Sequence, residues 1–259
     1  MRPEDALALL RWQIAIGADE ALAEEPIDRT AARPPASPVA PIPAAAPAVL
    51  RAVVPPAAAG SSAREAAAAA GSVEELRAAL AAFEGCALKK TATNLVFGDG
   101  DPTADVMLVG EAPGADEDRL GKPFVGVSGQ LLDRMLQAIG LDRRTAYITN
   151  ILPWRPPGNR KPTAAEIALC LPFVRRHIEL VAPRLLVCVG GTAASALLDR
   201  NEGIMKLRGR VLQYHTDNDN KTIDTICIFH PAFLLRSPGQ KREAWRDLLT
   251  IRRRLNISD

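Results

Sequence analysis

The sequence lacks a hydrophobic run that could cross a membrane. No apolar stretch in its 259 residues approaches the roughly 18 residues that a bilayer-spanning helix requires. The N-terminal segment carries acidic residues on both flanks of its apolar part, whereas a secretory signal starts with positive charge. We therefore expect a cytoplasmic protein with no membrane partner.

Cysteine is scarce, and its spacing fits neither a disulfide framework nor a zinc site. The four cysteines lie at positions 86, 170, 188 and 227 and form no C-x-x-C pair. Cys188 and Cys227 fall inside apolar strand-like runs, where cysteine acts as a small buried hydrophobic residue.

Two common enzyme signatures are also missing. The phosphate-binding pattern G-x-x-x-x-G-K-[ST] does not occur, which argues against a nucleoside triphosphate site. The nucleophile elbow G-x-S-x-G is absent, which counts against the usual α/β hydrolase. The net charge is only +2, with an acidic N-terminal and a basic C-terminal segment, so an anionic partner is permitted but not required.

Composition divides the chain into three parts. Residues 1–29 form an acid-flanked, helix-like segment, which is either a tail of marginal helicity or a docking helix for an unidentified protein partner. Residues 30–71 are rich in Ala and Pro, and repeated prolines block a packed helix or sheet, so we predict a semi-rigid tether. Residues 72–259 should form the folded domain.

Strand-like and helical patterns alternate through this last part. Apolar strand-like runs occupy 106–110, 146–151, 185–191 and 224–229. Helical patterns cover 128–140 or begin near 163, 192 and 237. The run T-A-A-E from Thr163 is typical of a capping box. This order predicts an α/β protein, a three-layer α/β/α sandwich with a mostly parallel central sheet, whose ligands bind at the carboxyl ends of the strands.

Polar residues follow three of these strands. Glu111 comes one residue past the first strand, where a ligand would lie. Asn150 ends the second, and although an asparagine there is more often a loop cap, its amide offers the donor and acceptor needed to read a base edge. His230 ends the last and shares the sheet edge with both, which favours a common role. Phe124, by residue type alone, is most often a core residue.

Two loops combine basic and apolar side chains. The first places basic groups on proline-stiffened backbone: Arg155, Arg160 and Lys161. The second offers apolar wedges beside basic groups: Phe233, Leu234, Leu235, Arg236 and Lys241. Basic groups bind phosphates and apolar wedges unstack bases, so together the loops are typical of an enzyme that extracts a base from a strand.

Three motifs in order resemble family 4 of the uracil-DNA glycosylase superfamily. They are GEAPGADED with KPFVG and GQLL, then TN-x-x-x-x-RPPGNR-x-P, then HPA-x-LLR with K-x-x-x-W-x-D, and they span about 165 residues between positions 86 and 249. The resemblance implies a uracil-DNA glycosylase-like fold and a catalytic domain at 72–259. It also implies a monofunctional enzyme of base excision repair, which we expect to be a monomer. The enzyme would flip uracil out of uracil-containing DNA, hydrolyse its bond to deoxyribose, and release uracil from an abasic site.

The same resemblance implies roles for single residues. Phe124 would stack on the flipped uracil, and Asn150 would bind its N3 and O4 edge and refuse cytosine. His230 would stabilise the negative charge that builds near O2. Glu111 and Glu117 are the candidates for placing water or balancing the cationic sugar. The other uracil-binding positions are Gly110, Ala112 and Gly114, and the expected DNA contacts are Arg155, Asn159, Arg160, Lys161, Leu234, Arg236 and Lys241.

One departure from the family concerns its cofactor. Family 4 members hold a four-iron iron–sulfur cluster on four cysteines, and the matching positions here are Phe83, Cys86, Trp154 and Cys170. Two thiolates cannot supply the usual four ligands. We therefore expect no metal and no cofactor, with the two aromatic residues filling the vacated volume.

Two alternatives from other classes stay open. The first is a protein that binds uracil or damaged DNA without cleaving it, or that traps it covalently. The covalently cross-linking branch of the superfamily uses an inserted basic loop with a histidine, and RPPGNRKPT is short and holds none. The second is a small-molecule α/β hydrolase or transferase, which would have no affinity for DNA.

The cofactor expectation has a direct test. Protein purified without oxygen should contain neither iron nor acid-labile sulfide, because the chain supplies only two thiolates at the matching positions. Metal analysis and a sulfide assay on the same sample measure this. Stoichiometric iron and sulfide would contradict it.

Overall fold

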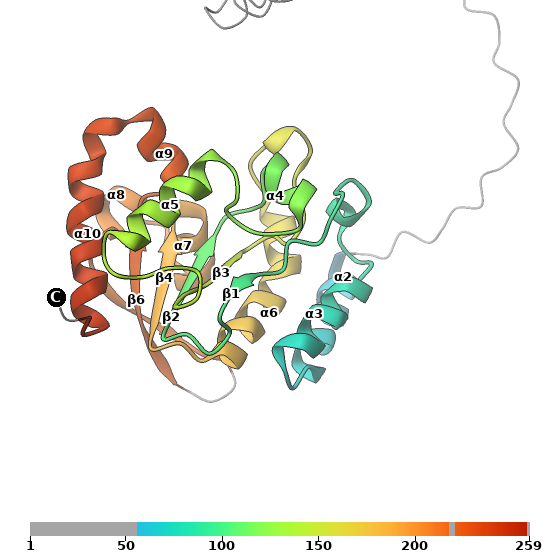
Figure 1. Cartoon of the computed structure of the whole chain (residues 1–259). Helices are drawn as coiled ribbons and strands as arrows, with labels where there is room; N and C mark the ends of the chain where they lie inside the picture. The colour runs from blue at the N-terminus through green and yellow to red at the C-terminus, as the bar shows by residue number, and fades with distance from the viewer. Residues whose placement is uncertain (1–55, 218–220, 258–259) are drawn as a thin grey trace, which may run out of the picture. The chain divides into compact units, whose positions relative to one another are not determined.

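A six-stranded sheet forms the centre of the computed structural model, which describes residues 56–217 and 221–257 (Figure 1). The strand order is β1-β3-β2-β4-β6-β5. The four central strands are parallel: β3 (Tyr147–Asn150), β2 (Val106–Gly110), β4 (Leu185–Val189) and β6 (Thr222–Ile228). The outer strands pair antiparallel: β1 (Asp99–Gly100) and β5 (Val211–His215).

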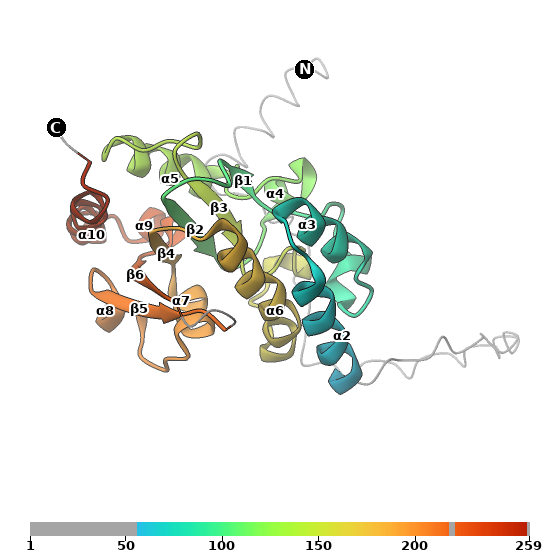
Figure 2. The same cartoon turned by 90° about the horizontal axis from the view of Figure 1, so that it is seen from below.

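Helices cover both faces of this sheet and give three layers (Figure 2). One face carries α5 (Val127–Gln137), α9 (Pro231–Arg236) and α10 (Lys241–Arg254). The other carries α6 (Ala164–Val181) and α7 (Gly191–Leu198), with α2 (Pro56–Ala69) and α3 (Val73–Ala82) outside α6. Shorter helices lie in the connections: η1 (Ala87–Lys90), α4 (Ala115–Leu120), η2 (Pro157–Asn159), α8 (Ile204–Leu207) and η3 (Pro238–Gln240).

Strand β2 shows why the strands read as continuous apolar runs. Val106 and Leu108 belong to the buried cluster under α5 and α10, while Met107 and Val109 belong to the cluster under α6. All four are at most 1% exposed. A strand covered on both faces needs apolar residues at every position, and so the predicted three-layer α/β/α sandwich with a mostly parallel sheet is confirmed.

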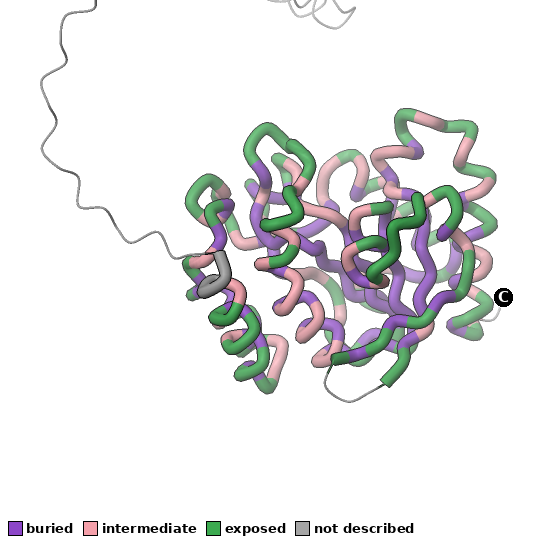
Figure 3. The backbone as a smooth tube through the Cα atoms, turned by 180° about the vertical axis from the view of Figure 1, so that it is seen from behind, coloured by how far each residue is buried: buried purple, intermediate pink, exposed green. Residues whose placement is uncertain are grey.

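Burial follows the same layers along the helices. Strands β2, β3 and β4 are buried along their length and β6 is buried from Thr225 onward, whereas the helices alternate buried and exposed positions (Figure 3). Helix α6 begins as the sequence predicts: Thr163 accepts a hydrogen bond from the Glu166 N–H, and Glu166 accepts one from the Thr163 N–H. Within the described ranges, no helix has both the length and the apolar character needed to cross a membrane.

Helix α2 corrects part of the predicted tether at 30–71. It packs against α6, and its Ala63 and Ala67 are at most 2% exposed. Arg176 of α6 donates two hydrogen bonds, of 3.0 and 2.8 Å, to the Ala70 carbonyl just past the end of α2. Alanine has the highest helix propensity, so the Ala-rich end of this segment folds although the Pro-rich composition suggested otherwise. Residues 30–55 of the tether and the N-terminal segment at 1–29 lie outside the described residues, and the three-part division remains a prediction.

The packing of α2 can be tested with two neighbouring alanines. Ala67→Glu should lower the free energy of unfolding by about 2 kcal/mol or more, because it forces a carboxylate into the α2–α6 contact. Ala68→Glu, at an exposed position of the same helix, should change it little. Thermal and urea unfolding measure both, and equal stability of the two variants would contradict a packed α2.

Candidate active site

The parallel register of the sheet brings the predicted polar residues together. Gly110 at the end of β2 pairs with Asn150 at the end of β3. Glu111 follows β2 directly, and His230 lies just past the end of β6. All three of these polar side chains line one cavity of about 500 Å³, which we call the edge cavity.

Most of the predicted site residues line the edge cavity. They are Glu111, Ala112, Gly114, Glu117, Phe124, Asn150, Asn159, Arg160, Lys161, His230 and Arg236. Gly110 lies beneath them, and a side chain at that position would collide with the Asn150 amide oxygen and the Phe124 ring. Glycine therefore lets these two side chains meet above the strand end.

Three residues predicted to contact DNA are not among those that line the edge cavity: Arg155, Leu234 and Lys241. Leu234 is 1% exposed and packs into the cluster with α5 and α10, so the structure contradicts its use as a wedge. Consecutive helical residues point about 100° apart, and in α9 the neighbouring Leu235 is the exposed one, at 39%. Arg155 donates a 2.7 Å hydrogen bond to Asn159, and Lys241 is exposed at the start of α10. The DNA contacts of these last two stay predictions.

The Asn150 amide oxygen has an unmet hydrogen-bonding requirement. Asn150 is 3% exposed, and its Oδ1 atom is fully buried without a partner among the described residues. An unpaired buried polar atom costs about 1–3 kcal/mol relative to a paired one. The Asn150 side chain lines the edge cavity, and its amide oxygen packs against Gly110.

His230 is held in one tautomer by the start of α9. Its Nδ1 accepts a 3.2 Å hydrogen bond from the Ala232 backbone N–H. Burial lowers the pKa of the imidazole below its usual value, although nearby Glu111 opposes this. A neutral ring whose Nδ1 accepts carries its proton on Nε2. Its ring centroid lies 5.5 Å from that of Phe124.

The two candidate glutamates differ in what already binds them. Glu117 is 7% exposed, and its Oε1 accepts the N–H groups of Val125 and Gly126 at 2.9 and 2.8 Å. Its Oε2 accepts the Gly114 N–H at 3.0 Å, so both oxygens accept hydrogen bonds from the surrounding backbone. Glu111 instead accepts a 2.5 Å hydrogen bond from the Thr192 hydroxyl through Oε2.

Thr192 is a site residue that sequence reasoning missed. It follows Gly190 and Gly191 after β4, whose carboxyl end lies at the same sheet edge as those of β2 and β3. The rule that ligands bind at this edge applies to every parallel strand. The sequence signal for Thr192 is its position just after the predicted strand at 185–191, the one predicted strand whose following residues were not considered.

The RPPGNRK loop is anchored at both ends. Trp154 at its start is 2% exposed. Arg160 near the end of the loop makes a bidentate ion pair with Glu166, with N–O distances of 2.9 and 2.6 Å. This hydrogen-bonded pair holds the pKa of Glu166 down at about 2. Lys161 is exposed at the cavity, which leaves its ammonium group accessible to an anion.

The four positions that match the cluster ligands of family 4 do not fit an iron–sulfur cluster. Phe83, Cys86, Trp154 and Cys170 all belong to one buried apolar cluster, and the Phe83 ring packs 5.2 Å from that of Phe173. A cavity beside Cys170 measures only about 10 Å³. The described part of the chain contains no group of three or more His, Cys, Asp or Glu side chains placed to hold a metal ion.

Comparison with known proteins identifies the class to which this fold and cavity belong. The chain belongs to the uracil DNA glycosylase superfamily, whose family model matches residues 97–249. It is 39% identical over 184 residues to a type-4 uracil-DNA glycosylase of Archaeoglobus fulgidus, across 70% of this chain and 92% of the relative. A type-4 uracil-DNA glycosylase of Thermotoga maritima is 40% identical over 59% of this chain and 77% of its own. One of Pyrobaculum aerophilum is 36% identical over 68% and 91%. The resemblance to family 4 and the uracil-DNA glycosylase-like fold are thereby confirmed.

The state of His230 can be measured directly. Nitrogen-15 NMR of the free protein should show a neutral imidazole with its proton on Nε2 at pH 7. The titration midpoint should lie below the ordinary value of 6.5, because burial disfavours the charged form. Histidines 177 and 215 can be assigned by substitution. A proton on Nδ1, or a midpoint above 6.5, would contradict the site as described.

Proposed function

We propose that this chain is a uracil-DNA glycosylase that flips uracil out of DNA and hydrolyses its N-glycosidic bond. The observation that carries the proposal is Asn150, whose buried Oδ1 has no partner among the described residues. Its side chain lines a cavity together with an aromatic ring and a neutral histidine. The family and the names of the relatives support the same substrate class.

Recognition of the base follows from the chemistry of the Asn150 amide. Uracil carries an N–H at N3 and a carbonyl at O4, which match the amide oxygen and the amide NH₂ group. Cytosine has a lone pair at N3 and an amino group at C4, so both contacts would be mismatched. A mismatch in a buried site leaves polar groups unpaired and is strongly rejected. The Phe124 ring would stack on the base.

The chemical step needs one group that stabilises negative charge on the departing base and another that takes a proton from the attacking water. As the bond from N1 to the sugar carbon breaks, its electron pair moves to the base and negative charge grows at O2. The Nε2–H of His230 would donate to that oxygen. Water then bonds to the sugar carbon, and Glu111 would orient it and take up its proton. Because water is the nucleophile, the enzyme would be monofunctional and would leave an abasic site.

The second glutamate has a different role in this proposal. Both Glu117 oxygens accept backbone N–H groups around the cavity, so it would position the backbone near Phe124 rather than handle water. The exposed Lys161 and Arg236 at the cavity would bind phosphates of the strand. The enzyme would work without an iron–sulfur cluster. Phe83 and Trp154 pack in the buried apolar cluster and would stabilise the region in which family 4 members hold their cluster.

Strand scission at a single uracil tests this function. Labelled oligonucleotides, single- and double-stranded, are incubated with the protein, treated with alkali and separated on a denaturing gel. Wild type should cleave at uracil, whereas Asn150→Ala and His230→Ala should each lose about 10²–10³-fold in rate, since each removes a contact to the departing base.

Two outcomes would contradict the proposal. Intact oligonucleotide with bound protein would indicate a binding protein, and a protein gel would reveal any covalent adduct. Equal rates for wild type and both variants would mean that the edge cavity is not the site of cleavage. Arg210→Gln, outside the cavity lining, serves as the matched control.

A further inference from the structure

We propose that Arg143, which does not line the edge cavity, is a positioning residue that holds Phe124 in place to stack on the base. The inference rests on the proposed function. It assigns Arg143 to affinity for the base rather than to bond cleavage.

Phe124 has a backbone conformation that needs support. Its φ angle is 54°, in the left-handed region that aromatic residues rarely adopt. Such a conformation is strained and persists only where surrounding contacts fix it. Phe124 is only 4% exposed, and its ring lines the edge cavity. The direction in which the ring enters the cavity therefore depends on the backbone conformation of Phe124.

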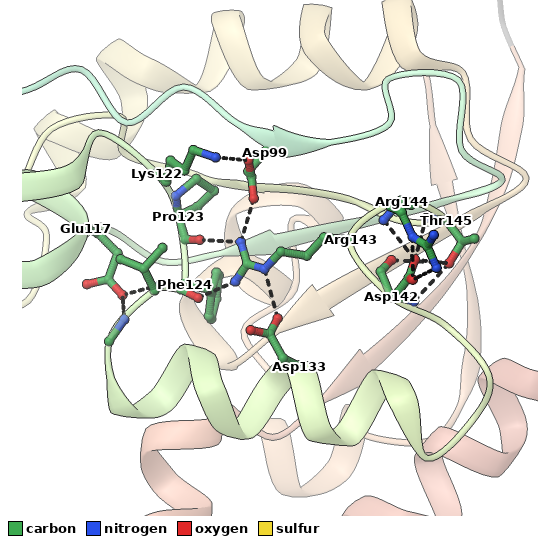
Figure 4. Close-up of polar contacts among 12 residues, drawn as sticks. Asp99, Glu117, Lys122, Pro123, Phe124, Asp133, Asp142, Arg143, Arg144 and Thr145 are labelled. Carbon is green, nitrogen blue, oxygen red and sulfur yellow. Dashed lines mark hydrogen bonds and ion pairs between the residues drawn. The ribbon is translucent and has the colours of Figure 1, made fainter.

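Arg143 holds the peptide groups on both sides of Phe124 (Figure 4). Its Nη1 donates to the Pro123 carbonyl at 3.0 Å, and its Nη2 donates to the carbonyl of Phe124 itself. Rotation about φ would move the first carbonyl, and rotation about ψ would move the second. Both rotations would therefore break a charge-assisted hydrogen bond.

The guanidinium is itself fixed by two carboxylates. Arg143 donates from Nη1 to Asp99 of β1 at 2.8 Å and from Nε to Asp133 of α5 at 2.9 Å. Lys122, which precedes Pro123, also pairs with Asp99 at 3.2 Å. The arginine thus ties the segment before Phe124 to a strand and to a helix at once.

Two further contacts fix the peptide group that follows Phe124. Glu117 accepts the Val125 N–H, so the peptide group between residues 124 and 125 is bound at its oxygen by Arg143 and at its nitrogen by Glu117. Gly129 of α5 lies against the Phe124 carbonyl, and any side chain there would collide with it.

The adjacent arginine provides a matched control. Arg144 has a side chain that is 90% exposed, and it pairs with Asp142 within its own loop at 2.8 Å. Arg143→Gln and Arg144→Gln make the same chemical change one residue apart. Only the first removes donors from the backbone of residues 123 and 124.

The experiment is a double-mutant cycle read by inhibition. Wild type, Arg143→Gln, Phe124→Leu and the double variant are compared for kcat on a uracil oligonucleotide and for the inhibition constant of free uracil. Arg143→Gln should raise that constant about tenfold and leave kcat within about twofold, because stacking contributes to binding of the base. In the Phe124→Leu background, Arg143→Gln should add little, since the ring it positions is gone. Arg144→Gln should match wild type.

Gly129→Ala tests the same contact with every charge intact. It displaces the Phe124 carbonyl, which accepts from Arg143, and should also weaken uracil inhibition if affinity for the base depends on the backbone of Phe124. An unchanged inhibition constant in the folded Arg143→Gln or Gly129→Ala variant, or losses that multiply in the double variant, would overturn the role of Arg143. Absence of cleavage by wild type would instead contradict the proposed function itself.

Discussion

A buried amide oxygen, which finds no donor within residues 56–217 and 221–257, is the constraint on which the carboxyl edge of the sheet depends. The Asn150 side chain can occupy this place because β2 and β3 are parallel and in a register that sets Gly110 beside it. A side chain at that glycine would fill the same space. In the proposed function, a ligand that donates to the unpaired oxygen would recover the free energy that its burial costs.

The groups around this oxygen are each fixed by a contact to the protein itself. The Ala232 N–H sets the tautomer of His230, and Thr192 holds one oxygen of Glu111. Phe124 is fixed through its backbone, by Arg143 outside the cavity and by Glu117 in its lining. Groups that are already oriented need no reorganisation when charge develops, which is the main source of electrostatic stabilisation in enzymes. In the proposed function, this arrangement would read the base and stabilise its departure.

Local patterns in the sequence predicted the layers of the fold, and contacts between distant segments decided the details. The central strands and the Thr163 capping box could be predicted because apolar runs and cap residues act over a few positions. Strand β5 was missed, since only Leu212 and Tyr214 alternate with exposed residues there. Helix α2 was missed because the Pro-rich composition around it suggested an unfolded tether. The burial of Leu234 could not be predicted because it depends on the residue at which α9 starts. The hydrogen bond from Thr192 to Glu111 joins residues 81 positions apart, a distance over which no local pattern acts.

The most direct measurement of the central claim is the affinity of the free protein for three small bases by calorimetry. Uracil and 1-methyluracil both carry the N3–H donor, and cytosine does not. The account predicts that uracil binds at least about 10²-fold more tightly than cytosine, because cytosine would place a lone pair against the buried Asn150 oxygen. It also predicts that 1-methyluracil, which mimics the bond to the sugar, is accepted. Equal affinity for uracil and cytosine would show that the Asn150 amide does not read the base.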